Sequence, residues 1–120
     1  MSRILTVDDS ASIRQMITLT LRTAGYQVEE AIDGVQGLEV ATATTVDAAI
    51  IDINMPRMDG LTLVRRLRAL PTYRFKPLLI LTTESSPEKK QEGRQAGATG
   101  WILKPFDPDR LLATMRKVMR

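Results

Sequence analysis

The sequence predicts an α/β fold, a parallel five-stranded sheet built from five strand–helix units, and two observations support this. Five short apolar runs recur along the chain, and the segments between them place apolar residues at helical spacing. Several runs are continuous rather than alternating, as in Ala48–Ile51 and Leu78–Leu81, which is typical of parallel strands buried on both faces. This alternation favours a (βα)5 domain with right-handed crossovers.

The expected strands follow the apolar runs directly. They are Arg3–Val7, Tyr26–Ala31, Asp47–Ile53, Pro77–Thr82 and Trp101–Leu103. Between the first two runs, an apolar stripe from Ile13 to Ala24 predicts a helix that ends at Gly25, a residue suited to a helix C-terminus. The next crossover carries a weaker stripe through Val35, Leu38 and Ala41.

The last three helices differ in strength. Leucine and valine at helical spacing from Leu61 to Leu70 predict a third helix that stops before Pro71. The fourth begins at Ser86-Pro87 and is nearly all polar, and its internal Gly93 costs about 1 kcal/mol relative to alanine, so we expect it to be the least stable helix. The fifth is apolar from Leu111 to Met119, with Asp107 as N-cap before a proline at the first helical position.

Composition restricts the chemistry. The chain has 120 residues, as expected for one domain, and contains no Cys and no His. Zinc fingers, Cys–His proteases, Ser–His–Asp triads and thioredoxin-type motifs are therefore excluded. No apolar stretch approaches the roughly 20 residues of a membrane span, so we expect a cytoplasmic location and no membrane insertion.

The charge is unevenly distributed along the chain. Residues 1–60 hold four Lys/Arg against nine Asp/Glu, or −5, whereas residues 61–120 hold thirteen against five, or +8. The net charge of +3 is therefore less informative than its asymmetry. We expect no nucleic-acid partner, because the basic half offers little aromatic content and no obvious base-reading helix.

Polar residues follow four of the five predicted strands. Asp8-Asp9 follow the first run, Asp52 lies near the end of the third, Thr82-Thr83 end the fourth, and Lys104-Pro105 follow the fifth. Ligands of open parallel α/β sheets bind beyond the carboxyl ends of the strands, so these groups should meet at one edge. Each has a simpler interpretation by itself: capping for Asp8-Asp9-Ser10, an ion pair for Asp52, and a solvated surface position for Lys104.

Three converging carboxylates would need a cation, because like charges disfavour joint ionisation. Oxygen ligands without His or Cys favour Mg²⁺ or Mn²⁺. A carboxylate can also attack phosphorus to form an acyl phosphate, and Asp52 is the best candidate for that role. Lys104 would add a second positive charge and Thr82 a hydrogen bond. Asp33-Gly34 and Asp59-Gly60 are interpreted as helix starts without a catalytic role.

Four segments together resemble the receiver domain of two-component response regulators, and especially stand-alone CheY-type chemotaxis regulators. They are Asp8-Asp9-Ser10, Asp52–Gly60, Leu81–Glu84 and Gly97–Phe106. The resemblance covers the whole chain. It implies a doubly wound, flavodoxin-like sheet in the order 2-1-3-4-5, of which CheY is itself a standard example. It also implies a receiver domain over residues 1–120 without an effector domain, so that output occurs by binding in trans.

The resemblance assigns a role to each matching residue. Asp52 corresponds to the phospho-acceptor, Asp9 and Asp52 to side-chain Mg²⁺ ligands, and Asn54 to a ligand through its backbone carbonyl, while Asp8 acts mainly through a metal-bound water. The remaining assignments are Thr82 as the switch hydroxyl, Lys104 as the phosphate-binding lysine in a cis peptide bond to Pro105, and Trp101 as the aromatic switch residue. Asn54, Thr83 and Glu84 occupy positions that tune phosphorylation and dephosphorylation.

Two of these positions depart from the usual family pattern. Thr83 stands where Ala, Gly or Ser is common, and we expect its bulk to restrict access of a phosphodonor or water to Asp52. Trp101 replaces Tyr or Phe, and its larger ring is harder to accommodate in an inward position.

The family resemblance also implies partners. A CheA-like sensor histidine kinase would supply the phosphoryl group, and a monomeric protein would then switch its binding surface for an output target such as the flagellar motor. Such a protein catalyses its own phosphorylation and slow hydrolysis but acts primarily as a signalling switch. Alternatives are a phosphate sink or relay receiver, a Mg²⁺-dependent phosphatase with an aspartyl phosphate intermediate, and a flavodoxin-like nucleotide binder. The phosphatase is disfavoured because Asn54, two residues after Asp52, cannot act as a general acid.

Overall fold

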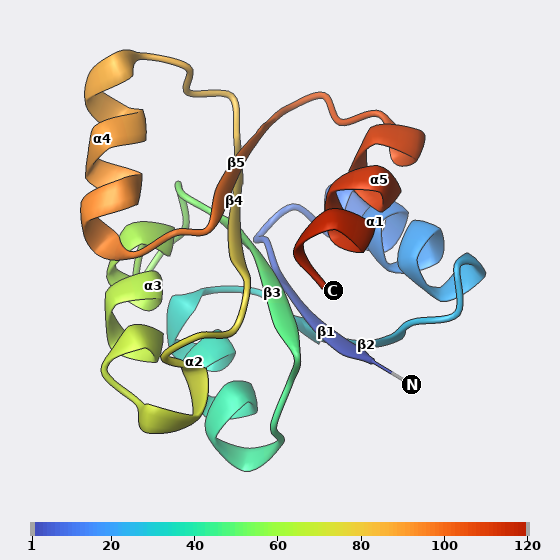
Figure 1. Cartoon of the computed structure of the whole chain (residues 1–120), viewed down its shortest axis with the longest axis horizontal. Helices are drawn as coiled ribbons and strands as arrows, with labels where there is room; N and C mark the ends of the chain where they lie inside the picture. The colour runs from blue at the N-terminus through green and yellow to red at the C-terminus, as the bar shows by residue number, and fades with distance from the viewer. Residues whose placement is uncertain (1, 120) are drawn as a thin grey trace.

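The computed structural model describes residues 2–119, in which helices cover both faces of a central parallel sheet (Figure 1). The strands are β1 (Arg3–Val7), β2 (Gln27–Ala31), β3 (Ala48–Asp52), β4 (Leu78–Thr82) and β5 (Gly100–Leu103). The helices are α1 (Ala11–Thr23), α2 (Gly34–Ala43), α3 (Gly60–Arg68), α4 (Pro87–Ala96) and α5 (Pro108–Val118), with a 3₁₀ turn at Pro71–Tyr73. The strand order β2-β1-β3-β4-β5 confirms the predicted fold class.

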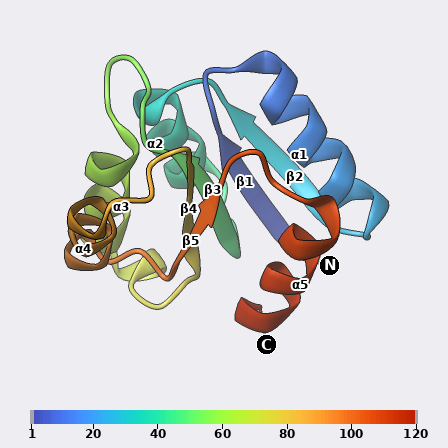
Figure 2. The same cartoon turned by 90° about the horizontal axis from the view of Figure 1, so that it is seen from above.

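The sheet separates two layers of helices, which are visible on either side of the strands in Figures 1 and 2. On one face α1 and α5 bury Ile17, Leu21, Leu111 and Met115 against the sheet. On the other face α2, α3 and α4 cover a second core of buried apolar side chains, which includes Leu63. β3 and β4 are buried at every residue, as their continuous apolar sequence predicts.

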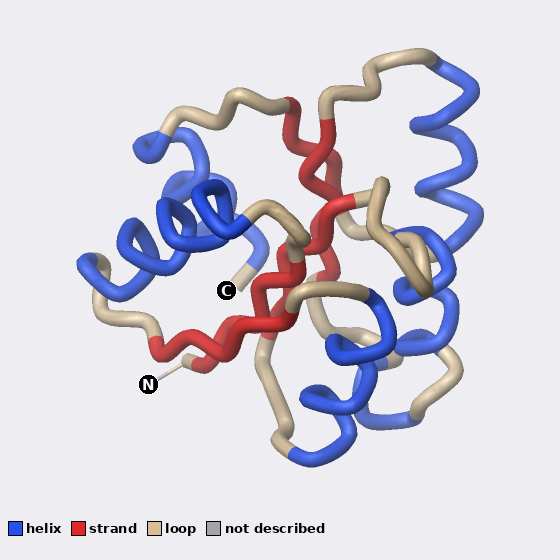
Figure 3. The backbone as a smooth tube through the Cα atoms, turned by 180° about the vertical axis from the view of Figure 1, so that it is seen from behind, coloured by secondary structure: helices blue, strands red, loops and turns tan. Residues whose placement is uncertain are grey.

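Strand boundaries differ from the sequence prediction by one residue at several ends. Asp47 precedes β3, where its carboxylate accepts a hydrogen bond from the Arg3 backbone N–H at 2.8 Å. Pro77 has no N–H to donate and lies before β4, although its carbonyl accepts a bond from the Ala49 N–H. Tyr26 likewise precedes β2, whereas Gly100 joins β5. The backbone tube of Figure 3 shows the strands running through the middle of the molecule between the helices.

Each α-helix begins at a residue whose side chain caps it. An oxygen of the N-cap residue accepts a backbone N–H bond at the start of every α-helix, and these residues are Ser10, Asp33, Asp59, Ser86 and Asp107. The predicted helix-start roles of Asp33 and Asp59 are therefore confirmed. Because Ser10 caps α1, Asp8 and Asp9 are not the capping residues of that helix.

The glycines at helix ends behave as the sequence indicates. Gly25 lies one residue beyond the α1 cap, with a φ of 96° that non-glycine residues rarely adopt. α3 ends at Arg68, two residues before the apolar stripe does, and Leu70 enters the 3₁₀ turn at Pro71. No helix among residues 2–119 is long and apolar enough to cross a membrane.

Candidate metal and phosphoryl-transfer site

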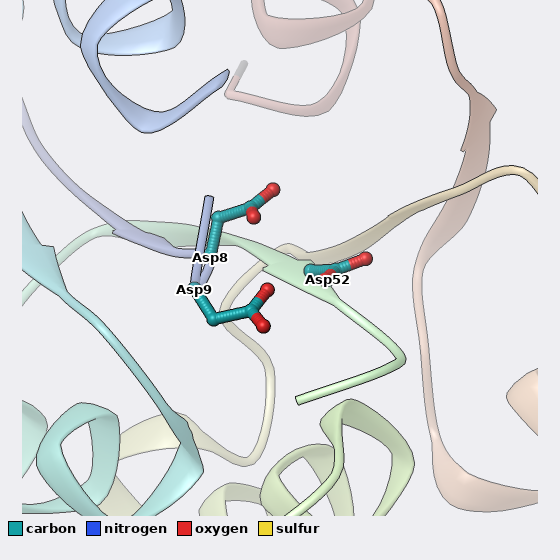
Figure 4. A group of neighbouring side chains, drawn as sticks. All are labelled: Asp8, Asp9 and Asp52. Atoms are coloured by element: carbon teal, nitrogen blue, oxygen red, sulfur yellow. The ribbon is translucent and has the colours of Figure 1, made fainter. Parts of the chain in front are cut away.

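Three carboxylates converge where β1 and β3 end. Asp8, Asp9 and Asp52 each place a carboxylate oxygen within 4.8 Å of the others. Figure 4 shows Asp8 and Asp9 extending from the segment after β1 toward Asp52 at the end of β3. Asp8 and Asp52 are buried, whereas Asp9 is exposed. β1 and β3 are hydrogen-bonded neighbours, so their carboxyl ends bring these residues together.

Local backbone contacts hold Asp8 in this orientation. Its N–H donates to the Ala31 carbonyl at 3.1 Å, and its own carbonyl accepts a bond from Arg14 at 2.7 Å. Its Oδ1 accepts the Ser10 N–H at 2.9 Å. The other oxygen, Oδ2, is buried and accepts no hydrogen bond, although Lys104 Nζ lies 3.2 Å away. Asp8 therefore offers one buried oxygen to a cation.

Lys104 closes the site from the end of β5. Its Nζ lies 3.1 Å from Asp52 Oδ1 and 3.2 Å from Asp8 Oδ2. Its backbone N–H donates to the Thr82 carbonyl at 2.8 Å, and the peptide bond to Pro105 is cis. The structure thus brings together Asp8, Asp9, Asp52 and Lys104.

The charges of the site are not balanced by Lys104 alone. Burial and the neighbouring Asp8 raise the pKa of Asp52, and the hydrogen bond from Lys104 only partly opposes this. Burial would lower the pKa of Lys104, but the hydrogen bond and charge of Asp52, together with Asp8, raise it. When all are ionised, three carboxylates face one ammonium group. A further cation would relieve this excess of negative charge.

The donor set fits Mg²⁺. All candidate ligands are oxygens, and one of them, Asp8 Oδ2, is buried without a hydrogen bond. Mg²⁺ prefers carboxylate and carbonyl oxygens and usually keeps several bound waters. Because Asp9 is exposed, solvent can reach this side of the site and supply those waters. Asp8, Asp9 and Asp52 would hold the ion. The exposed Asn54, the predicted backbone-carbonyl ligand, lies two residues after Asp52 in the β3–α3 loop.

The two other predicted switch residues lie outside the carboxylate cluster. Thr82 is buried at the end of β4, and its Oγ1 accepts the Glu84 N–H at 3.1 Å. The half-buried Trp101 on β5 donates from its indole Nε1 to the Glu84 carbonyl at 2.8 Å. Thr83 is exposed. Both Thr82 and Trp101 therefore contact the same residue of the β4–α4 loop.

Two contacts were not predicted from the sequence. A Cβ on Gly93 would lie 2.7 Å from Cζ3 of Trp101, so the helix-weakening glycine of α4 makes room for the indole ring. Arg57, in the loop after Asp52, forms a two-point ion pair with Asp33. The glycine inside a polar helix marked an unusual position but did not indicate its partner, and local sequence carried no signal for the second contact.

Comparisons with known proteins identify the family of the chain. Residues 4–116 match the family model for the response regulator receiver domain. The chain is 42% identical over 118 residues to the response regulator MprA of Mycobacterium ulcerans (strain Agy99). It is 35% identical over 120 residues to the DNA-binding dual master transcriptional regulator RpaA of Synechocystis. These alignments cover 98% and 100% of the chain but only 50% of each relative, so the chain spans about half the length of these curated relatives.

Solved structures show the same similarity. The chemotaxis protein CheY4 of Vibrio cholerae superposes with a TM-score of 0.95 and 52% identity over 98% of both chains. A CheY-like receiver domain protein of Methanospirillum hungatei JF-1 superposes with a TM-score of 0.93 at 29% identity, covering 99% of this chain and 94% of that one. The fold and site define a phosphorelay signalling domain. The chain belongs to the response regulator receiver domain family.

Proposed function

We propose that this receiver domain is a phosphorylation-controlled switch in which Asp52 accepts a phosphoryl group from a histidine kinase. The observation that carries the proposal is the convergence of Asp52 with Asp8, Asp9 and Lys104. Burial and the charge of Asp8 raise the pKa of Asp52 and so disfavour its ionised form, which a bound cation would favour; this supports a Mg²⁺-dependent reaction. We place this reaction in the cytoplasm, where response regulators typically act.

The chemistry requires one carboxylate nucleophile. An oxygen of Asp52 attacks the phosphorus of the kinase phosphohistidine, a P–O bond forms as the P–N bond breaks, and the imidazole keeps the electron pair and takes up a proton. Bound Mg²⁺ supplies positive charge to the phosphoryl oxygens. Lys104 already lies beside Asp52, so its ammonium group is placed to stabilise the same developing charge.

The switch would run from Thr82 to Trp101 through Glu84. The Thr82 hydroxyl is held by the Glu84 N–H, and the Trp101 indole is held by the Glu84 carbonyl. When the Thr82 hydroxyl turns toward a phosphoryl group on Asp52, the bond to Glu84 is lost and the loop can rearrange. The surface of α4, β5 and α5 then changes for an output partner.

Phosphorylation is tested with acetyl phosphate and Mg²⁺, with intact-protein mass spectrometry as the measurement. We expect one acid-labile phosphoryl group on the wild-type protein and none on Asp52→Asn. The matched control is Asp59→Asn, because Asp59 caps α3 nearby and asparagine caps a helix about as well. Phosphorylation of Asp52→Asn at the wild-type level would overturn the assignment.

We further propose that the protein acts as a stand-alone receiver in chemotaxis. The support is its 52% identity to CheY4 over 98% of both chains, against 42% and 35% identity to MprA and RpaA. An antibody to this domain should detect a native protein near 13.4 kDa in the source organism. A band about twice that size would instead favour a two-domain regulator.

The output partner is tested by binding to a purified flagellar motor switch protein. We expect binding by beryllofluoride-treated protein and none by treated Asp52→Ala. Phosphoryl transfer back to the kinase without any motor binding would favour a phosphate sink or relay. Salt-sensitive, sequence-selective DNA binding would favour the transcriptional class.

A further inference from the structure

The loop that follows Asp52 is attached to α2 at two consecutive residues. Residues 53–59 connect β3 to α3, and Asn54 lies within this loop. Arg57 Nε donates to Asp33 Oδ2 at 2.8 Å, and a second guanidinium nitrogen donates to Asp33 Oδ1 at 3.1 Å. At the next residue, the Met58 carbonyl lies so close to Gly34 that a Cβ there would be 2.4 Å away. The loop backbone is thus pressed against the first turn of α2.

Arg57 adopts a backbone conformation that needs such an attachment. Its φ is 67°, and it is the single non-glycine residue with positive φ among residues 2–119. The left-handed region is disfavoured for a residue with a long side chain unless surrounding contacts hold it there. A two-point guanidinium–carboxylate contact supplies direction as well as attraction.

Asp33 is well placed to be the fixed half of this pair. Its side chain is 5% exposed, and Oδ1 also accepts the Gln36 N–H at 2.8 Å as the cap of α2. The hydrogen bond from Arg57 and the contacts with the α2 start lower the pKa of Asp33, so it stays ionised. The other end of the loop is equally restricted, because a Cβ on Gly60 would lie 2.1 Å from the Asp52 carbonyl oxygen.

We propose that Asp33 and Arg57 are positioning residues for the cation site, and that their ion pair holds the loop backbone carrying Asn54 beside Asp52. This proposal rests on the proposed Mg²⁺-dependent function. Neither residue belongs to the cluster formed by Asp8, Asp9 and Asp52. They act through the loop: if the pair is broken, the segment between Asp52 and Met58 samples more conformations, and the site is no longer preorganised for the ion.

The test is Mg²⁺ titration by calorimetry on the wild-type protein and on Arg57→Asn, Arg57→Gly and Asp33→Asn. Outer partners of metal ligands commonly change affinity by about tenfold or more, so we expect each variant to raise the Mg²⁺ dissociation constant about tenfold. A double variant that combines an Arg57 substitution with Asp33→Asn should bind Mg²⁺ no more weakly than either single variant, because both changes break the same contact. Arg57→Gly also removes the backbone strain at this position, which protects the test from a simple folding defect.

The sign of the Arg57 effect separates positioning from simple electrostatics. Removal of a positive charge near the site would by itself tighten Mg²⁺ binding, whereas loss of the loop attachment weakens it. The matched control is Lys76→Gln, which breaks the Lys76–Asp47 ion pair at the opposite end of the sheet and should leave Mg²⁺ affinity unchanged. Unchanged or tighter binding by both Arg57 variants would overturn the positioning role, while the site assignment would stand. A wild-type protein that binds no Mg²⁺ would overturn the proposed function itself.

Discussion

The β3–α3 and β4–α4 units are neighbours: their strands pair in the sheet and their helices cover the same face. The two units differ in the contacts that fix their helices and loops. Their strands are equivalent, since all five residues of each are buried. Their helices are not: α3 buries Leu61, Leu63, Val64 and Leu67, whereas the buried residues of α4 are Gly93 and Ala96. Because burial of apolar side chains is the main source of local stability, α3 should stay in place while α4 opens more easily.

The loops repeat this contrast. The loop before α3 is held by the Arg57–Asp33 pair and by the close contact of Gly60 with Asp52. The loop before α4 is held mainly at Glu84, by Thr82 and Trp101. The far end of α4 is fixed, because Arg68 of α3 donates to the Gly97 carbonyl at 2.8 Å. From this comparison we expect one unit to keep Asp52, the proposed phosphoryl acceptor, in position and the other to move more easily at its N-terminal end.

The largest expected effect distinguishes the two helices by stability. Leu67→Ala in α3 should lower the free energy of unfolding by about 2–5 kcal/mol, because it opens a cavity at a residue that is 1% exposed. Ala96→Gly, at a buried site of α4, should cost only about 1 kcal/mol. Urea unfolding measures both. Equal losses would show that α4 is anchored as firmly as α3.

A smaller effect is expected from a methyl group at Gly60. The added Cβ would meet backbone atoms of Asp52, which cannot rotate away, so we expect Gly60→Ala to cost about 3 kcal/mol and to weaken phosphorylation. Urea unfolding and acetyl phosphate labelling report the two consequences. Wild-type values for both would mean that the start of α3 can shift without disturbing Asp52.

The equivalent change in α4 should be tolerated. In Gly93→Ala the new Cβ meets the edge of the Trp101 ring, which can move, and alanine favours the helix by about 1 kcal/mol. We expect the unfolding free energy to change by less than about 1 kcal/mol. Displacement of the ring should also shift the emission of the single tryptophan to longer wavelength. An unchanged spectrum would contradict the contact between Gly93 and Trp101.

The smallest expected effect is the pH dependence of stability that arises from Asp52 at the end of β3. Because the folded-state pKa of Asp52 is raised above 3.8, its ionisation opposes folding, and this cost develops as pH rises through the folded-state pKa. In metal-free buffer, Asp52→Asn should therefore be more stable than the wild-type protein at pH 7, and the difference should shrink as pH falls toward 3.8. Thermal unfolding across this range is the measurement.

The control for this pH effect is Thr82→Val at the end of β4. Thr82 carries no titratable group, so any stability change in this variant should not depend on pH. A constant difference between Asp52→Asn and the wild-type protein at all pH values would contradict the raised pKa of Asp52.

The sequence by itself determined the fold class, the succession of strands and helices along the chain and the strand-end residues of the site. Continuous apolar runs such as Leu78–Leu81 are readable because burial on both faces excludes polar residues, and Ser86, Asp59 and Asp107 are readable as caps because the bonds they make are local. The family resemblance supplied the strand order. Asp8, Asp52 and Lys104 could be predicted to meet because parallel strands end at one edge.

Only the tertiary structure decided which partners these residues have. The contact of Gly93 with Trp101 and the pairing of Arg57 with Asp33 join positions 8 and 24 residues apart through packing between separate elements. The glycine looked like a weakness of α4, and the sequence around Arg57 gave no indication of its partner. Local sequence records the propensity of each segment, but such contacts depend on the distance and direction between elements, which exist only once the sheet and its helices are assembled.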